Sequence, residues 1–110
     1  MMKFNNPEPK TREELERNFN SNDVQLITES LVALVLYEKD WRWAQNICLA
    51  FLDSNNPDIS GLAANSLGHI ARVNHKLDKE KVKFALENKI NDPLIGGRVQ
   101  DALDDIEIYL

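Results

Sequence analysis

NPDISGLA at residues 56–63 and DPLIGGRV at residues 92–99 read as two copies of one phrase. The first copy leads into Leu67 and the second into Leu103, and these two leucines, like the two prolines, are 36 positions apart. A fixed period in this range is typical of stacked helical hairpins, in which each unit buries its apolar face only against its neighbours. The repeat therefore predicts a helical protein that acts by presenting a surface.

Six residues that can cap a first helical turn divide the chain into helices. They are Thr11, Asn22, Asp40, Asn56, Asp78 and Asp92. Thr11 also forms a capping box with Glu14. Asn56 and Asp92 each precede a proline, whose fixed φ and missing N–H suit the first position of a helix. Apolar spacing after each cap predicts helices over about residues 11–18, 22–37, 41–52, 57–73, 79–89 and 93–109. The helix 22–37 is apolar on more than one side, so we expect it to be the most enclosed.

No segment alternates apolar and polar residues as a strand does, so the sequence predicts an all-α fold. Short connections predict antiparallel pairs over residues 11–37, 41–73 and 78–109. Right-handed stacking of these pairs gives a short solenoid. We expect residues 1–10, with two prolines and no periodicity, to form a flexible tail, and residues 11–110 to form one domain.

The chain is acidic, with a net charge of −5 and a pI near 5.0. This is the wrong sign for holding phosphates, so we expect no direct binding of nucleic acid, whereas a basic protein partner would be attracted. One cysteine excludes an internal disulfide framework, and the N-terminus lacks the apolar core of a signal peptide. The longest apolar run, residues 31–36, is too short to span a bilayer. We therefore expect a cytoplasmic protein without membrane contact.

The sequence offers no set of residues for catalysis, a metal or a cofactor. His69 and His75 are six apart, on different sides of a helix, and no further ligand completes a metal set with them. Cys48 lies on an apolar stripe, which predicts a buried structural thiol. Adjacent carboxylates such as Asp104 and Asp105 do not face each other across a substrate. We expect a protein that is not an enzyme.

Two groups of polar residues are candidates for binding a partner. Asp101, Asp104 and Asp105 are three and four apart, so they share one helix face, near a C-terminus where the helix dipole disfavours negative charge. This placement indicates either use in binding or an ordinary solvated face. The second group lies on the outward side of helix 57–73 and consists of Asn65, His69 and Arg72. These three residues are in register with Asp101, Asp105 and Ile108, 36 positions later, which predicts one polar surface across two repeats.

Trp41 and Trp43 form a third candidate group. They are two positions apart, so a helix cannot bury both in one stripe. A tryptophan left exposed is a candidate anchor for a protein interface, because this residue concentrates binding energy.

The segment LAANSLGHIAR at residues 62–72 resembles the second helix of a HEAT repeat, and GRVQDALDDI at residues 97–106 is similar to it. Small alanines and a Leu-Gly pair let helices approach closely there. This resemblance covers about residues 40–110. Taken whole, the chain is similar to small bacterial immunity proteins of polymorphic toxin systems, including contact-dependent growth inhibition (CDI).

The resemblance implies tight binding to a toxin domain delivered by a neighbouring cell, with the toxin's active site blocked, and such toxins are often basic nucleases. One alternative is a HEAT-like adaptor or regulatory scaffold that binds an endogenous protein. Another is a HEAT-like enzyme, such as a bilin lyase or a helical-repeat DNA glycosylase, and the acidic charge argues against the glycosylase.

Overall fold

A computed structural model describes residues 7–110, and over this range the chain forms six helices and no strand. The helices are α1 (Arg12–Phe19), α2 (Val24–Tyr37), α3 (Trp41–Leu52), α4 (Pro57–Asn74), α5 (Lys79–Glu87) and α6 (Gly96–Tyr109). The prediction of an all-α fold is confirmed. Of the expected tail, residues 1–6 lie outside the described residues, and residues 7–10 precede α1 without regular structure.

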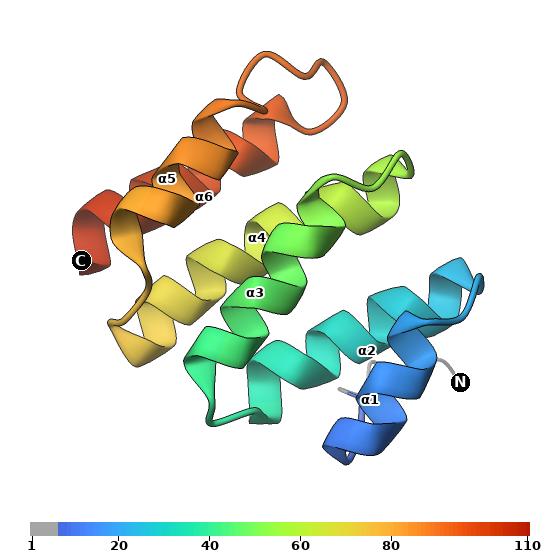
Figure 1. Cartoon of the computed structure of the whole chain (residues 1–110). Coiled ribbons are helices and arrows are strands. Elements are labelled where there is room, and N and C mark those ends of the chain that lie inside the picture. The colour runs from blue at the N-terminus through green and yellow to red at the C-terminus, as the bar shows by residue number, and fades with distance from the viewer. Residues whose placement is uncertain (1–6) are drawn as a thin grey trace, which may run out of the picture.

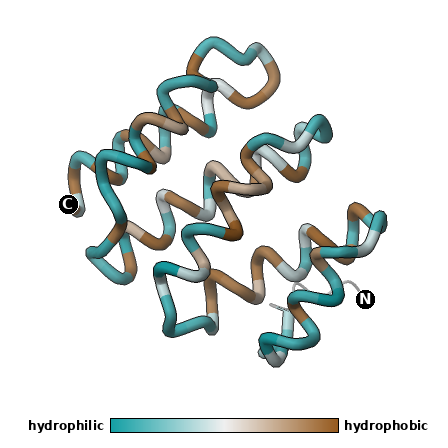
Figure 2. Tube along the Cα trace, viewed as in Figure 1, coloured by the Kyte–Doolittle hydropathy of each residue, from teal (hydrophilic) through white to brown (hydrophobic). Residues whose placement is uncertain are grey.

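The helices form two layers (Figure 1). Helices α2, α4 and α6 run in the same direction in one layer, which we call the even-helix layer. Helices α1, α3 and α5 run beside them in the odd-helix layer, and α3 and α5 are antiparallel to their partners α4 and α6. The connections within the first two pairs, residues 20–23 and 53–56, are short, as the sequence predicts. The connection from α5 to α6, residues 88–95, is longer than expected and forms a wide loop (Figure 1). Hydrophobic positions recur along the helices, and α1 is predominantly hydrophilic (Figure 2).

Local capping explains where the helices begin. Thr11 and Glu14 form the expected capping box, and the side chains of Asp40 and Asn56 accept hydrogen bonds from their first turns. The cap of the second helix lies one residue later than expected, because the side chain of Asp23, and not that of Asn22, accepts from the N–H of Leu26 at 3.1 Å.

The expected helix start at Pro93 is wrong. The carboxylate of Asp92 accepts from the N–H of Leu94 at 2.8 Å, and its carbonyl accepts from the N–H of Gly96 at 2.8 Å. These bonds close a local turn over residues 93–95. Helix α6 therefore begins only at Gly96.

Helix α4 is the most enclosed helix, and the prediction that helix 22–37 holds this place is wrong. Ten of the 18 residues of α4 are buried, against five of the 14 in α2. The reason is position: α4 packs against α2, α3 and α6, whereas the outer side of α2 has no further helix to cover it. Leu36 and Tyr37 of α2 consequently stay exposed.

Small residues let α4 and α6 approach closely. A Cβ added at Gly68 would lie 2.8 Å from Asp105 Oδ2 and 3.1 Å from Ala102 Cα. The core between the helices includes Leu67 and Ile106 as predicted, but Leu103, the repeat mate of Leu67, is only half-buried. None of the described helices combines the length and apolar character that crossing a membrane requires.

Candidate functional site

The polar residues predicted on α4 and α6 meet in one network. Arg72 donates from one terminal nitrogen to Asp105 Oδ2 at 3.2 Å and from the other to His69 Nδ1 at 3.2 Å. Asn65 lies exposed on the same stripe of α4, one turn before His69. The predicted register between the two repeat helices thus brings His69, Arg72 and Asp105 together on the outer side of the even-helix layer, which we call the even-helix face.

The acidic residues of α6 play unequal parts in this face. Asp105 is half-buried and its charge is paired with Arg72. Asp101 is exposed, and Asp104 is exposed and accepts a hydrogen bond from Gln100 at 2.9 Å. Asp101 and Asp104 therefore keep their negative charge available to a partner.

Partial burial, and then the neighbouring Arg72, lower the pKa of His69 below its usual value, while Asp105 opposes this shift. The neutral imidazole is the form that can accept the hydrogen bond from Arg72 through Nδ1. Protonation of His69 would place two cations side by side. The network is therefore most stable above the ordinary pKa range of histidine.

The two layers differ in charge. Within the even-helix layer, α6 has one arginine and four carboxylates, α2 has one glutamate, and α4 has one aspartate and one arginine, which leaves −4. Within the odd-helix layer, α1 has two arginines and three glutamates, α3 has one arginine, and α5 has three lysines and two glutamates, which leaves +1. The acidity of the chain is thus concentrated in α2, α4 and α6.

An apolar hollow of about 200 Å³ lies between α2 and α4, beside the polar network. Its apolar lining comes from Val32, Val35, Leu36 and Leu62, and its rim includes Asn65, His69 and Arg72. These apolar residues were not predicted as site residues, because three of them belong to helix 22–37, which the sequence predicts to be the most enclosed helix. The signal in the sequence was that helix 22–37 is apolar on more than one side. Because a helix buries one stripe against the core, the apolar residues on its other side are free to form a surface site.

Trp41 and Trp43 do not join this face. Both are half-buried on α3, in the odd-helix layer. The guanidinium of Arg12 lies 4.0 Å from the ring centre of Trp43, and that of Arg42 lies 4.7 Å from the ring centre of Trp41. Both rings also pack against the core. Each indole is thus partly covered from within the molecule, which favours a structural role.

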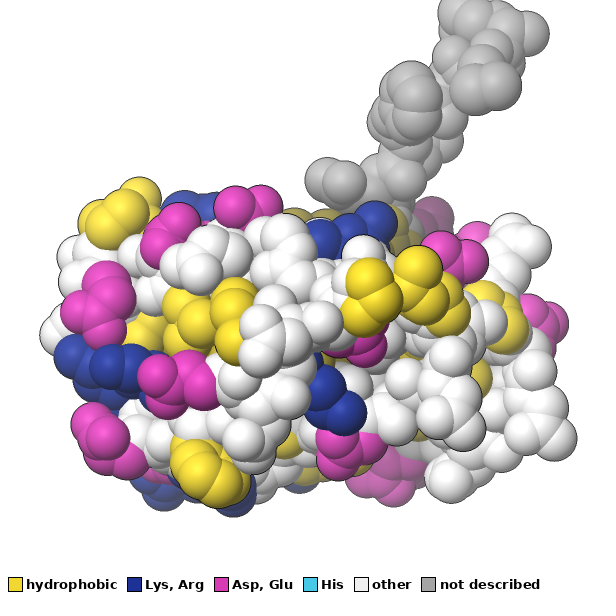
Figure 3. Space-filling model, turned by 90° about the horizontal axis from the view of Figure 1, so that it is seen from above, with side chains coloured by type: hydrophobic (Ala, Val, Ile, Leu, Met, Phe, Trp, Pro, Cys, Tyr) yellow, Lys and Arg dark blue, Asp and Glu magenta, His cyan; other side chains and the backbone are white. Residues whose placement is uncertain are grey.

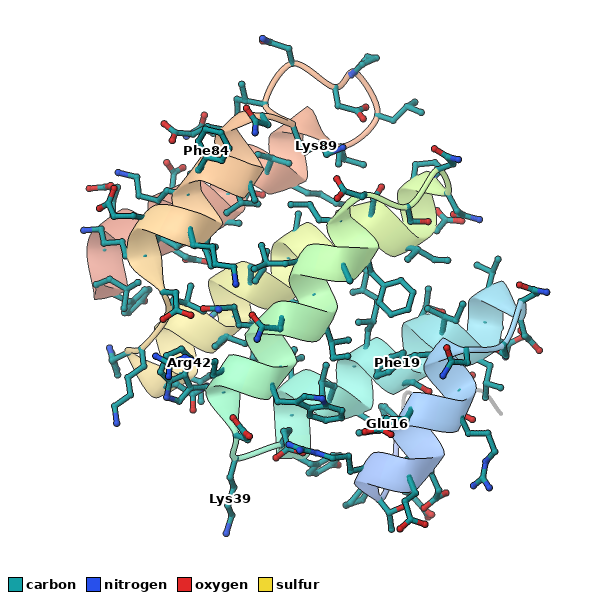
Figure 4. All side chains as sticks on the ribbon, in the orientation of Figure 1. Glu16, Phe19, Lys39, Arg42, Phe84 and Lys89 are labelled. Carbon is teal, nitrogen blue, oxygen red and sulfur yellow. The ribbon has the colours of Figure 1, made fainter. Side chains whose placement is uncertain are left out.

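Ion pairs link the N-terminal ends of the odd helices. Arg12 of α1 bonds Asp40 at 3.2 Å, and Arg42 of α3 bonds Asp78 at 3.0 Å, so each arginine near the start of one odd helix bonds the residue that precedes the next (Figure 4 labels Arg42). The expectation that the side chain of Asp78 caps its helix is wrong. Its carboxylate instead accepts from Arg42 and from the buried Gln45, at 2.8 Å, and these bonds lower its pKa.

A second hollow, of about 490 Å³, opens between α3 and α5. Leu49, Leu52 and Ala85 line it, and Phe84 stands at its edge with 68% of its surface exposed (Figure 4). Lys81 and Lys89 border the hollow, and Lys89 pairs with Asp53 at 3.1 Å. Charged and apolar side chains are interspersed on the face that Figure 3 shows. The hollow of the odd-helix layer is larger than that of the even-helix layer, and each has charged side chains at its border.

Within residues 7–110, no three His, Cys, Asp or Glu side chains gather as a possible metal site. His69 belongs to the network above, and His75 caps the end of α4 with a φ of 54°. Cys48 is fully buried, and this burial raises the pKa of its thiol to about 12. The thiol is therefore protonated at neutral pH and shielded from reagents.

No protein-family model matches this sequence, and no curated protein matches it. A solved structure does match, namely a chain in the crystal structure of a CDI complex from Cupriavidus taiwanensis LMG 19424. The two chains superpose with a TM-score of 0.88 and 25% sequence identity, over 99% of this chain and 98% of that chain. In fold, this protein is therefore similar from end to end to one component of a CDI complex.

Proposed function

We propose that this protein is an immunity protein of a contact-dependent growth inhibition system, which binds a partner toxin domain and neutralises it. The observation that carries the proposal is the end-to-end likeness to a chain of a CDI complex, at a TM-score of 0.88. The likeness extends over 99% of this chain and 98% of that chain, so it concerns the whole fold and not one part of it. The likeness agrees with the resemblance noted in the phrases at residues 62–72 and 97–106.

The scaffold in this proposal is a short, HEAT-like, right-handed solenoid that acts in the cytoplasm by binding alone, without catalysis or a cofactor. Two observations support it: the 36-residue period of the sequence, and the common direction of α2, α4 and α6 (Figure 1). In stacked repeats, equivalent side chains of successive units line up into one extended surface. The bond between Arg72 of one repeat helix and Asp105 of the next fits such a surface.

The proposed toxin-binding surface is the even-helix face, and the proposed toxin is a basic nuclease. The charge of −4 on the even-helix layer supports this choice, because a nuclease that holds phosphates presents positive charge. Asp101 and Asp104 would lie against that positive groove, where substrate phosphates otherwise bind. Inhibition then follows from occlusion, since bound nucleic acid and bound immunity protein exclude each other.

The proposal predicts that a toxin-bearing C-terminal domain is encoded directly upstream of this gene, and the test uses that domain. We expect the two purified proteins to form a one-to-one complex and the toxic activity of the domain to disappear at equimolar ratio. Co-expression should also restore growth of cells that produce the domain. A toxin domain from an unrelated system serves as the control, and we expect it to be neither bound nor inhibited.

A toxin domain that stays active in the presence of excess protein would contradict the proposal. Binding without loss of toxic activity would favour the alternative of an adaptor or scaffold.

A further inference from the structure

We propose that the hollow between α2 and α4 receives one apolar side chain of a basic protein partner, and that this contact anchors the complex. The inference rests on the proposed function, since the partner meant is the toxin domain. It goes further by assigning the centre of the interface to Val32, Leu36 and Leu62 rather than to charged residues.

The hollow has the size and lining of a receptor for a single side chain. Its volume of about 200 Å³ comes from four aliphatic residues on two helices, and Ser66 is buried beside them. Leu36 remains 39% exposed and the adjacent Tyr37 remains 43% exposed. Apolar surface of this kind gains most when a partner removes it from water.

The surroundings of the hollow match the anatomy of a protein interface. Interfaces commonly combine an apolar centre with a polar rim. Here the rim includes Asn65, His69 and Arg72. Arg72 hydrogen-bonds His69 within the rim and Asp105 of α6 beside it, each at 3.2 Å. Because the charge of Arg72 is already paired with Asp105 of the same molecule, the rim needs no acidic group from the partner.

Charge identifies the occupant as part of a basic protein. The hollow opens on the layer that carries −4, and most of this charge lies on α6, which packs beside α4. The larger hollow between α3 and α5 is bordered by Lys81 and Lys89, on the layer that carries +1. The layer on which the first hollow opens therefore attracts a basic partner more than the layer of the second hollow does.

The experiment truncates the two hollows separately and measures the affinity for the upstream-encoded toxin domain. The double variant Val32→Ala with Leu36→Ala enlarges the first hollow, and alanine suits the interior of a helix. Phe84→Ala removes the exposed ring beside the second hollow and is the matched control. Circular dichroism and thermal unfolding establish that each variant is folded.

We expect the double variant to weaken binding by at least about 30-fold, mainly through faster dissociation, as expected for an interface anchor. The loss should be nearly the same at low and high salt, because the contact is apolar. We expect Phe84→Ala to bind within about twofold of the parent.

Three outcomes would overturn the inference. The first is a folded double variant that binds as tightly as the parent, and the second is Phe84→Ala as the weaker binder. The third is a parent protein that dimerises through this hollow, seen in analytical ultracentrifugation as a dimer that the double variant abolishes. A parent protein that does not bind the toxin domain at all would instead contradict the proposed function.

Discussion

The even-helix and odd-helix layers are held together by different means. Helices α4 and α6 pack closely at Gly68 and Ala102, whereas α3 and α5 make few close contacts with each other and leave the larger hollow between them. Bonds between an arginine of one odd helix and the aspartate before the next, such as Arg42 to Asp78, link the odd helices instead. The close packing of the repeats therefore lies in one layer and much of their polar linkage in the other.

The difference also separates stability from recognition. In the even-helix layer, the inner sides of the helices form the core, while the outer side carries the acidic residues and the apolar hollow. In the odd-helix layer, Arg12 and Arg42 bond the aspartates that precede the next odd helices. Substitutions in the core and at the ends of the odd helices should therefore change stability, whereas substitutions on the outer side of the even helices should change recognition.

The largest effect is expected from Leu67→Ala, in the centre of the even-helix layer. Leu67 is fully buried, so its truncation should lower the free energy of unfolding by about 2–5 kcal/mol. Leu103→Ala changes the repeat-equivalent residue, which is only half-buried, and should cost clearly less. Urea denaturation of both variants measures the difference. Equal losses would show that the two positions are equally enclosed.

Gln45→Leu should produce the next largest effect, and it lies in the odd-helix layer. Gln45 is buried, accepts from the backbone N–H of Asp78 at 2.7 Å and donates to its carboxylate at 2.8 Å. Leucine has similar size but leaves both groups of Asp78 without this partner, so we expect a loss of about 1–3 kcal/mol. The exposed Gln100→Leu in α6 is the control, with an expected change below about 0.5 kcal/mol. Similar thermal midpoints for both variants would contradict this role of Gln45.

Gly68→Ala against Gly61→Ala tests the close approach of α4 and α6. At Gly68 the new Cβ would meet Asp105 Oδ2 and the backbone of Ala102, whereas at Gly61 it would meet only the flexible side chain of Arg98. Alanine also favours the helix by roughly 1 kcal/mol at either site. We therefore expect Gly61→Ala to be neutral or stabilising and Gly68→Ala to destabilise by about 1–2 kcal/mol. If differential scanning calorimetry gave the two variants the same melting temperature, the helix contact would not be limited at Gly68.

Much of the fold follows from local signals in the sequence. The capping box at Thr11 and the asparagine before Pro57 mark helix starts that the structure confirms, because capping depends on residues within one turn. The start of α6 was predicted too early, since Asp92 closes a turn with the same chemistry by which it could cap a helix. A local signal therefore predicts that the side chain of Asp92 accepts a backbone hydrogen bond, but it does not decide whether that bond caps a helix or closes a turn.

The candidate site was only partly predictable. Register along the repeat placed His69, Arg72 and Asp105 on one face, and the structure brings them into contact. The hollow beside them could not be predicted, because periodicity identifies an apolar side of α2 but does not say whether another helix covers it. Likewise, the bond from Arg12 to Asp40 spans 28 positions and depends on how α1 and α3 pack.

The smallest expected effect concerns the rate at which the toxin domain is captured. The double variant Asp101→Asn with Asp104→Asn removes two negative charges. Among the described residues, neither carboxylate forms an ion pair, and the pair of Asp105 with Arg72 is left in place. At low salt we expect association to slow by about 3- to 10-fold with unchanged helical content, because charge near an interface steers encounter more than it stabilises the fold. Glu80→Gln with Glu87→Gln makes the same change in charge on α5, in the odd-helix layer, and should leave the rate within about twofold of the parent. Raising the salt concentration should bring all three proteins together, since screening acts over about 8 Å at physiological ionic strength. Stopped-flow association over a salt series measures this, and equal slowing by both double variants would mean that net charge matters but the even-helix face does not.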